Sequence, residues 1–312
     1  MSKTQEIRNK INAQIVAALE SGKTPPWKRP WCLGENTGSP ANAVSKKSYR
    51  GINPLLLDLA SMRHGFTSRW WGTFNQIKSM GGCVKRRPND VPEGQWGSTV
   101  VFWSPISRKV GDGTGDEADE KFFVLRTYTV FNIEQTEGDF DHLRAGAVLP
   151  GDEAIEIDYR PAQDVIDATN IDIRHGGDRA YYSPVGDYIQ LPPKSTFKSM
   201  AGYWETLFHE AIHATEHPTR LNWSRKIKEN SYAMGELISE LGACYLSREL
   251  GIPAAEENMD SHVGYLAGWL AAMKGDSSFI FQAAAQASKA SDSILSFSRT
   301  SSEEPEVALA CF

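Results

Sequence analysis

The sequence predicts an α+β fold divided into two domains, on three observations. The chain has 312 residues, which is enough for two ordinary domains. Segments with apolar residues at every third or fourth position occur beside short apolar runs typical of strands. Charge also divides the chain, since residues 1–110 hold 17 Lys and Arg against 6 Asp and Glu, whereas residues 111–312 hold 16 against 33. This asymmetry indicates two different tasks, with an anionic partner for the first half.

The boundary between the domains is expected in residues 136–152, a linker with few periodic apolar residues and with Gly, Pro and acidic side chains. The N-terminal α+β domain then covers residues 1–135. The C-terminal domain, mainly helical with a small sheet, covers residues 153–295. The polar residues 296–312 are expected to form a flexible tail.

The expected elements of the first half begin with a helix over residues 4–20, where isoleucine or leucine recurs at a spacing of four. Pro25-Pro26 forbids its continuation. Further elements of this half are a helix at 53–61, an aromatic-rich segment, 67–80, ended by Gly81-Gly82, and strands at 99–103 and 122–132. The second half is expected to contain strands at 171–174 and 188–191 and helices at 161–170, 199–217, 232–250, 260–274 and 277–295.

The composition argues against a membrane protein and against a disulfide-rich one. Mean hydropathy is −0.41, and no run of 18 apolar residues occurs. The cysteines are scattered without a Cys-x-x-Cys pair: Cys32, Cys83, Cys244 and Cys311. This pattern suits a reducing compartment, so we expect a cytoplasmic protein.

The segment His209-Glu210-Ala211-Ile212-His213 predicts a metal-binding helix of the metallopeptidase type. Two histidines four residues apart project from one helix face and can hold one Zn²⁺ ion. Glu210 follows the first of them and is the expected general base, because it can take a proton from a water on the metal. Mn²⁺ or Co²⁺ can occupy a site with these ligand types.

A third ligand is required, and the sequence limits where it can lie. The long metzincin pattern is excluded, because Glu216 and Thr219 stand where that class has Gly and His. His217 is eight residues after His209, about 80° around the helix and a turn further along the axis, so it is disfavoured.

The next helix offers a better third ligand. The residues Glu236 to Glu240 resemble the Glu-x-x-Ser/Ala-Asp/Glu helix of gluzincins. That resemblance implies Glu236 as the ligand and Glu240 as the partner that orients a histidine. Both acids share one helix face, so the reverse assignment stays open. The C-terminal domain is thus expected to be gluzincin-like, and Tyr188 to Leu191 could be its edge strand for extended substrate.

Cations alternate with aromatic side chains in the basic half, a combination that suits phosphates and unpaired bases. No helix-turn-helix or zinc finger is evident, which favours sequence-tolerant binding of single-stranded DNA. Trp71 and Trp103 are expected in the core instead. The expected DNA-binding residues are Trp27, Lys28, Arg29, Trp31, Lys46, Lys47, Tyr49, Arg50, Arg69, Trp70, Phe74, Lys78, Arg86 and Arg87.

Ordered motifs over about residues 5–295 resemble the ArdC antirestriction family of conjugative plasmids and phages, whose N-terminal domain also occurs in TraC-type primases. Glu216 is a departure, because relatives usually carry Gly there. The motifs include Tyr49-Arg50-Gly51-Ile52-Asn53, Trp71-x-Thr73-Phe74-x-Gln76, Tyr128-x-Val130-Phe131-Asn132-x-x-Gln135, Thr206-Leu207-Phe208-His209-Glu210 and Glu240-Leu241-Gly242-Ala243.

The resemblance implies a single-stranded-DNA-binding domain, a zincin-like metallopeptidase domain, and protection of incoming plasmid or phage DNA from host restriction. A host protein is the candidate peptidase substrate, which the resemblance by itself does not establish, and the sequence leaves the oligomeric state open. Two alternatives remain: a DNA-binding protein whose metal site is structural, and a primase-associated accessory protein.

Overall fold

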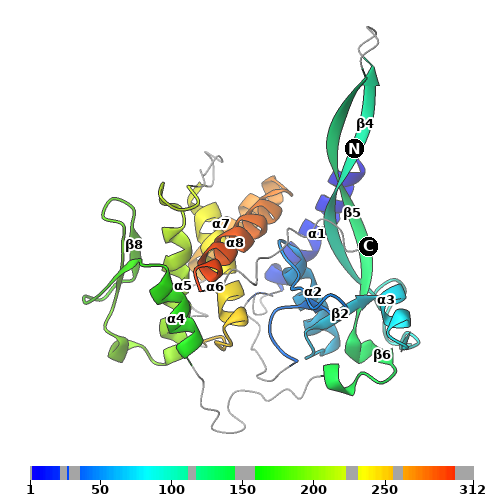
Figure 1. Ribbon diagram of the computed structural model, residues 1–312, viewed down its shortest axis with the longest axis horizontal. Helices are drawn as coiled ribbons and strands as arrows, with labels where there is room; N and C mark the ends of the chain where they lie inside the picture. Colours follow the sequence, from blue (N-terminus) through cyan, green and yellow to red (C-terminus); the bar gives the residue numbers. More distant parts are fainter. Residues whose placement is uncertain are drawn as a thin grey trace.

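The computed structural model describes residues 2–21, 27, 36–111, 117–144, 159–222, 231–255 and 263–298. It confirms the expected α+β architecture with a helical C-terminal region and small sheets. Figure 1 shows a group of helices on one side, the N-terminal sheet on the other, and a long hairpin that projects beyond both. No helix within these ranges is long and apolar enough to cross a bilayer.

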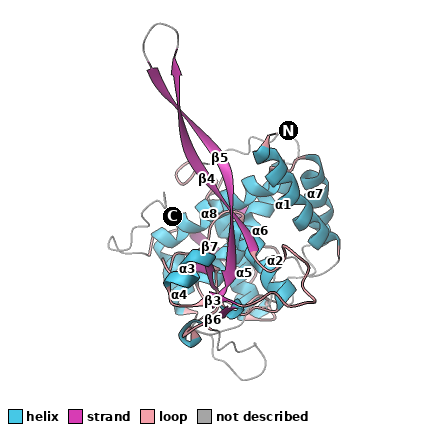
Figure 2. Cartoon of the chain, turned by 90° about the vertical axis from the view of Figure 1, so that its right-hand side faces the viewer, coloured by secondary structure: helices cyan, strands magenta, loops and turns pink. Residues whose placement is uncertain are grey.

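The N-terminal half combines three helices with a mixed sheet in the strand order β1-β2-β5-β4. Strand β4 pairs antiparallel along its whole length with β5, and the two form the projecting hairpin, which Figure 2 shows from a second side. The elements of this half are α1 (Lys3–Glu20), β1 (Ala41–Asn42), α2 (Asn53–His64), β2 (Trp70–Thr73), α3 (Phe74–Ser79), β3 (Cys83–Val84), β4 (Ser98–Gly111), β5 (Glu117–Asn132) and β6 (Thr136–Glu137).

Several motif residues of this half build the fold. The Thr73 side chain accepts from the Gln76 backbone N–H, and the Gln76 side chain accepts from the Thr73 backbone N–H, so α3 begins with a capping box. The aromatic-rich segment therefore divides into a strand and a short helix. Asn132 anchors β5 by donating to the Ser68 carbonyl at 2.8 Å.

The N-terminal core extends past the expected start of the linker at residue 136. Strand β6 pairs with β3, and Phe140 and Leu143 are buried against Ile77. Gly82 is needed here, because a Cβ on it would lie 2.2 Å from the Phe140 ring. Residues 136–144 therefore belong to the N-terminal core, and the expected linker start is corrected.

The C-terminal half packs four long helices beside a three-stranded sheet of order β7-β9-β8. This order places Tyr188–Leu191 at the centre of the sheet, so the expectation that it is the edge strand is wrong. The elements are α4 (Arg160–Ala168), β7 (Asp172–His175), β8 (Tyr181–Ser183), β9 (Tyr188–Leu191), α5 (Met200–Ala214), α6 (Ser231–Glu249), α7 (Val263–Gly275) and α8 (Phe279–Ser296).

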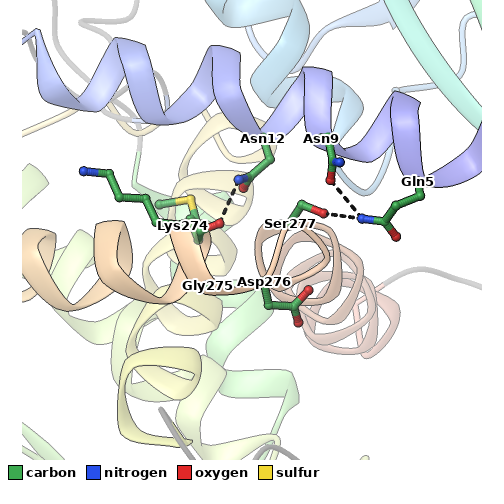
Figure 3. A pocket seen from close by; sticks show the side chains of 8 residues that line it. Gln5, Asn9, Asn12, Lys274, Gly275, Asp276 and Ser277 are labelled. Carbon is green, nitrogen blue, oxygen red and sulfur yellow. Dashed lines mark hydrogen bonds between the residues drawn. The ribbon is translucent and has the colours of Figure 1, made fainter. Parts of the chain in front are cut away.

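Helix α1 packs against the C-terminal helices, although it comes first in the chain. Its buried Ile11, Ile15 and Leu19 belong to the same apolar cluster as Trp269 of α7. The Asn12 amide donates to the Met273 carbonyl at 2.8 Å. Figure 3 shows this joint, where polar side chains line a surface pocket of about 420 Å³ between α1 and the turn after α7.

A buried ion pair also connects the two halves. Arg248 of α6 contacts Asp58 of α2 at 2.7 Å, with side chains 0% and 3% exposed. Burial acts to lower the pKa of Arg248, but the charge of Asp58 raises it above its ordinary value. The pair therefore stays charged in an apolar surrounding, where each partner depends on the other.

We expect Arg248→Ala to lower the free energy of unfolding by about 3–5 kcal/mol, because the carboxylate of Asp58 would stay buried without the cation that pairs with it. Chemical denaturation measures this loss. The matched control is Lys274→Ala, which removes an exposed ion pair with Glu20 and should cost about 0.5 kcal/mol or less. Equal effects of the two substitutions would contradict this role of the buried pair.

Candidate metal centre and nucleic-acid surface

Three side chains from two neighbouring helices converge as metal ligands would. His209 and His213 of α5 and Glu236 of α6 offer ligand atoms that all lie within 4.8 Å of one another. The Nε2 atom of His209 is 3.4 Å from Glu236 Oε2, and that of His213 is 3.6 Å from Glu236 Oε1. Two imidazoles and one carboxylate are a donor set that suits a divalent cation and leaves room for a water molecule.

The packing of α5 on α6 brings these residues together. Ser199 caps the start of α5 by accepting from the Gly202 backbone N–H at 3.0 Å. Ile212 is buried, and it lies so close to Gly242 of α6 that a Cβ there would be 2.7 Å from the Ile212 side chain. A glycine at this crossing therefore allows α6 to present Glu236 to both histidines.

Charge in the cluster is arranged to hold a cation. Burial by itself raises the pKa of Glu236, but hydrogen bonds with His209 and His213 lower it to about 2. Burial likewise acts to lower the pKa of His213, whereas Glu216 and Glu236 raise it to about 9. Since the surrounding carboxylates favour positive charge at this point, a divalent cation fits the residues present.

Two further carboxylates lie behind the histidines. Glu240 Oε2 is 3.9 Å from His209 Nδ1, the position that the resemblance implied for an orienting partner. Glu216 Oε1 is 3.3 Å from His213 Nδ1, a contact that sequence reasoning missed. The signal was present, because Glu216 follows His213 by three residues and so shares its helix face.

His217 is not among the three converging ligands, and its described contacts lie elsewhere. Its Nδ1 lies 2.8 Å from Thr219 Oγ1 and 3.7 Å from Asp187 Oδ2. Asp187 also accepts from Arg220 at 2.6 Å and from the Tyr182 hydroxyl at 2.8 Å. This network attaches the turn between β8 and β9 to the C-terminal end of α5, so it holds the small sheet beside the metal helix.

The expected base and a tyrosine pair lie close to the cluster. Glu210 is buried, and its charge acts on His213 and on Tyr265. The hydroxyls of Tyr232 and Tyr265 are 3.3 Å apart. Their hydrogen bond, partial burial and the charges of Glu236 and Glu210 raise the pKa of Tyr265. Tyr232 precedes Glu236 by one helical turn, so this pair borders the same site.

The structure corrects two expectations about tryptophans of the basic half. Trp27 is 0% exposed and packs edge-on against Trp269 at 6.0 Å between ring centroids, so its expected role in base stacking is wrong. Trp103 is 46% exposed on the projecting hairpin, so its expected place in the core is wrong. Trp71 is buried as expected.

The other expected DNA-binding residues divide into exposed and engaged groups. Lys28, Arg29 and Trp31 lie outside the described residues. Arg69 is half-buried; its guanidinium donates to the Ser39 carbonyl at 2.9 Å, and burial lowers its pKa although Glu249 opposes this. Trp70 and Tyr49 are half-buried, and Arg50 pairs with Asp292. Exposed residues are Lys46, Lys47, Phe74, Lys78, Arg86 and Arg87.

We expect Glu236→Gln to lose far more metal affinity than Glu240→Gln or Glu216→Gln. Loss of a charged ligand removes a bond to the ion, whereas loss of an orienting carboxylate costs about 10- to 100-fold. Titration of the three variants with Zn²⁺ and Mn²⁺, followed by metal analysis, measures the difference. Wild-type affinity in Glu236→Gln would contradict the ligand set.

Each half of the chain matches a known protein family. Residues 160–286 match a family of zincin-like metallopeptidases, and residues 5–131 match the N-terminal domain of the anti-restriction factor ArdC. Protein y4eC of Sinorhizobium fredii is 33% identical over 92% of this chain and 91% of its own. The DNA primase TraC of Escherichia coli is 31% identical over 94% of this chain, which spans only 27% of TraC.

Solved structures give the same result at the level of the fold. The metal-free crystal structure of the antirestriction protein ArdC from plasmid R388 is 37% identical, with a TM-score of 0.74 over 93% of this chain and 97% of that one. Its Mn(II)-bound structure is 36% identical, with a TM-score of 0.71 over 94% and 98%. The chain therefore belongs to the ArdC antirestriction family and joins an ArdC-type N-terminal domain to a zincin-like metallopeptidase domain.

Proposed function

We propose that the protein binds single-stranded DNA through its basic half, protects incoming plasmid or phage DNA from restriction, and carries a divalent-metal peptidase centre. The observation that carries the enzymatic part is the convergence of His209, His213 and Glu236 within 4.8 Å, beside Glu210. The DNA-binding part of the proposal rests on the positive charge of residues 1–110, which contain 17 Lys and Arg but 6 Asp and Glu.

We assign Zn²⁺ as the preferred ion and Mn²⁺ or Co²⁺ as ions that can replace it. Two imidazoles and a carboxylate suit each of them. The R388 relative was crystallised with Mn(II) bound, which supports a divalent cation here. When bound, such an ion acidifies a coordinated water and polarises a carbonyl oxygen.

The residues around the ligands have separate tasks in this proposal. Glu216 accepts from the Nδ1–H group of His213, and Glu240 lies 3.9 Å from Nδ1 of His209, where its charge favours a proton on that nitrogen. Each Nε2 lone pair is then directed to the cation. Glu210 takes a proton from the attacking water and passes it to the leaving amine. Burial of Glu210 strengthens its electrostatic interaction with the reacting groups.

The edge strand β8 is the proposed site for an extended peptide. Among the strands that the structure describes, β8 pairs on one side, with β9, so its other side can add a further strand. Strand β8 also contacts α5, which carries both histidines. We infer that a substrate segment paired with β8 passes the metal ligands in extended form.

Glu210→Gln is expected to keep the metal and lose peptidase activity by at least about a hundredfold, because the amide cannot accept the proton. Cleavage of fluorescein-labelled casein measures activity, and metal content with circular dichroism verifies the site and the fold. Cleavage at the wild-type rate would exclude Glu210 as the base. Restriction protection that persists in this variant would favour the second candidate function, a DNA-binding protein with a structural metal.

Affinity for a single-stranded oligonucleotide is expected to fall steeply with salt, because phosphate contacts release counterions. For about five contacts the loss between about 50 and 200 mM salt is roughly a hundredfold. Fluorescence anisotropy with labelled oligo-dT measures the slope. A salt-independent affinity would argue against the basic surface as the binding site.

A further inference from the structure

Two tryptophans expected to bind DNA, Trp27 and Trp70, are engaged in contacts within the fold. Trp27 is buried against Trp269. Lys46 Nζ and the Arg69 guanidinium lie over the Trp70 ring, 4.5 and 5.2 Å from its centroid, and the Trp70 Nε1 donates to Asn36 at 2.7 Å. Neither Trp27 nor Trp70 is therefore well placed to stack on a base, and other exposed rings of the N-terminal half are better candidates.

The root of the β4–β5 hairpin presents such rings, from three separate segments. Phe102 of β4 is 44% exposed. Its ring centroid lies 5.6 Å from that of Tyr128 on β5 and 6.5 Å from that of Tyr49, which precedes α2. Both tyrosines are partly buried against the core cluster of Trp71. We call Tyr49, Phe102 and Tyr128 the aromatic platform; its outer tyrosines are anchored and its central ring is exposed.

A cation stands directly beside the aromatic platform. Arg126 is the cross-strand partner of Phe102, so their Cβ atoms are about 5 Å apart, and it is exposed. It precedes Tyr128 by two residues and so shares its face of the sheet. The strand segments 98–106 and 123–132 contain no Asp or Glu, whereas residues 117–120 at the far end of the hairpin hold three. An anionic ligand is therefore favoured at the root.

We propose that the aromatic platform with Arg126 is a stacking site for unpaired bases of single-stranded nucleic acid, a role that rests on the DNA binding proposed above. The exposed Phe102 ring provides a face for a base, and the Arg126 guanidinium meets the adjoining phosphate. A duplex offers no free base faces to these rings. A docking surface for an apolar protein segment would not require a cation such as Arg126 beside the rings.

The test compares ring substitutions in the full-length protein by fluorescence anisotropy with labelled oligo-dT. Phe102→Ala and Phe102→Leu should each weaken binding about tenfold, because both remove the flat ring. Phe102→Tyr should retain wild-type affinity. The matched control is Phe297→Ala, which removes another exposed phenylalanine at the end of α8 and should change nothing.

Arg126→Gln provides an independent readout, since loss of one phosphate contact should reduce the slope of log affinity against log salt by about 0.7. Thermal unfolding verifies that each variant is folded. Phe102→Leu keeps the test valid if the alanine variant is unstable, because it removes the ring but keeps an apolar side chain.

The outcomes separate the platform from the broader DNA-binding proposal. If the wild type fails to bind the oligonucleotide at low salt, the proposed function fails. If the wild type binds and Phe102→Leu binds equally well, the platform is rejected and DNA binding stands. Loss of affinity in Phe74→Ala alone would move the site to α3 and overturn the proposal. Unchanged affinity with an altered sedimentation coefficient would assign the platform to protein contact, and would overturn it too.

Discussion

The crossing of α5 and α6 is the contact on which the metal centre depends. Ile212 lies against Gly242, where any side chain would collide with it, and this closeness allows Glu236 to reach both histidines. Interiors are packed too densely to absorb an added Cβ without movement of a helix. The distance of 3.4 Å between His209 Nε2 and Glu236 Oε2 thus depends on apolar packing between the same two helices.

Helix α6 serves both halves of the molecule. Its first turns carry Glu236, and its last turn carries Arg248, which pairs with Asp58 of α2. Nearby, the Tyr245 hydroxyl donates to the Gly51 carbonyl at 3.0 Å. The basic half and the metal centre are therefore attached to one rigid element. Such an arrangement fixes the position of the basic half relative to the metal centre.

The motif residues of the N-terminal half serve mostly to build the fold. Asn53 exchanges two hydrogen bonds with the Val101 backbone, and Gln135 caps the turn after β5. Polar residues of this kind resemble functional residues in a sequence. In the fold they are buried and form hydrogen bonds with backbone groups, which is a structural task. The aromatic platform could not be recognised as a group from the sequence, because Tyr49, Phe102 and Tyr128 are far apart in the chain.

Local periodicity alone determined the helices, the β-type runs of the hairpin and the pair His209 and His213, because a helix places residues four apart on one face. It also disfavoured His217 for the same reason. Tertiary structure decided what periodicity cannot express: the burial of Trp27, the exposure of Trp103 and the central place of β9. Exposure and strand order depend on which distant elements pack together. The hydrophobic effect favours such packing, but the residues next to one another in the chain do not specify which elements meet.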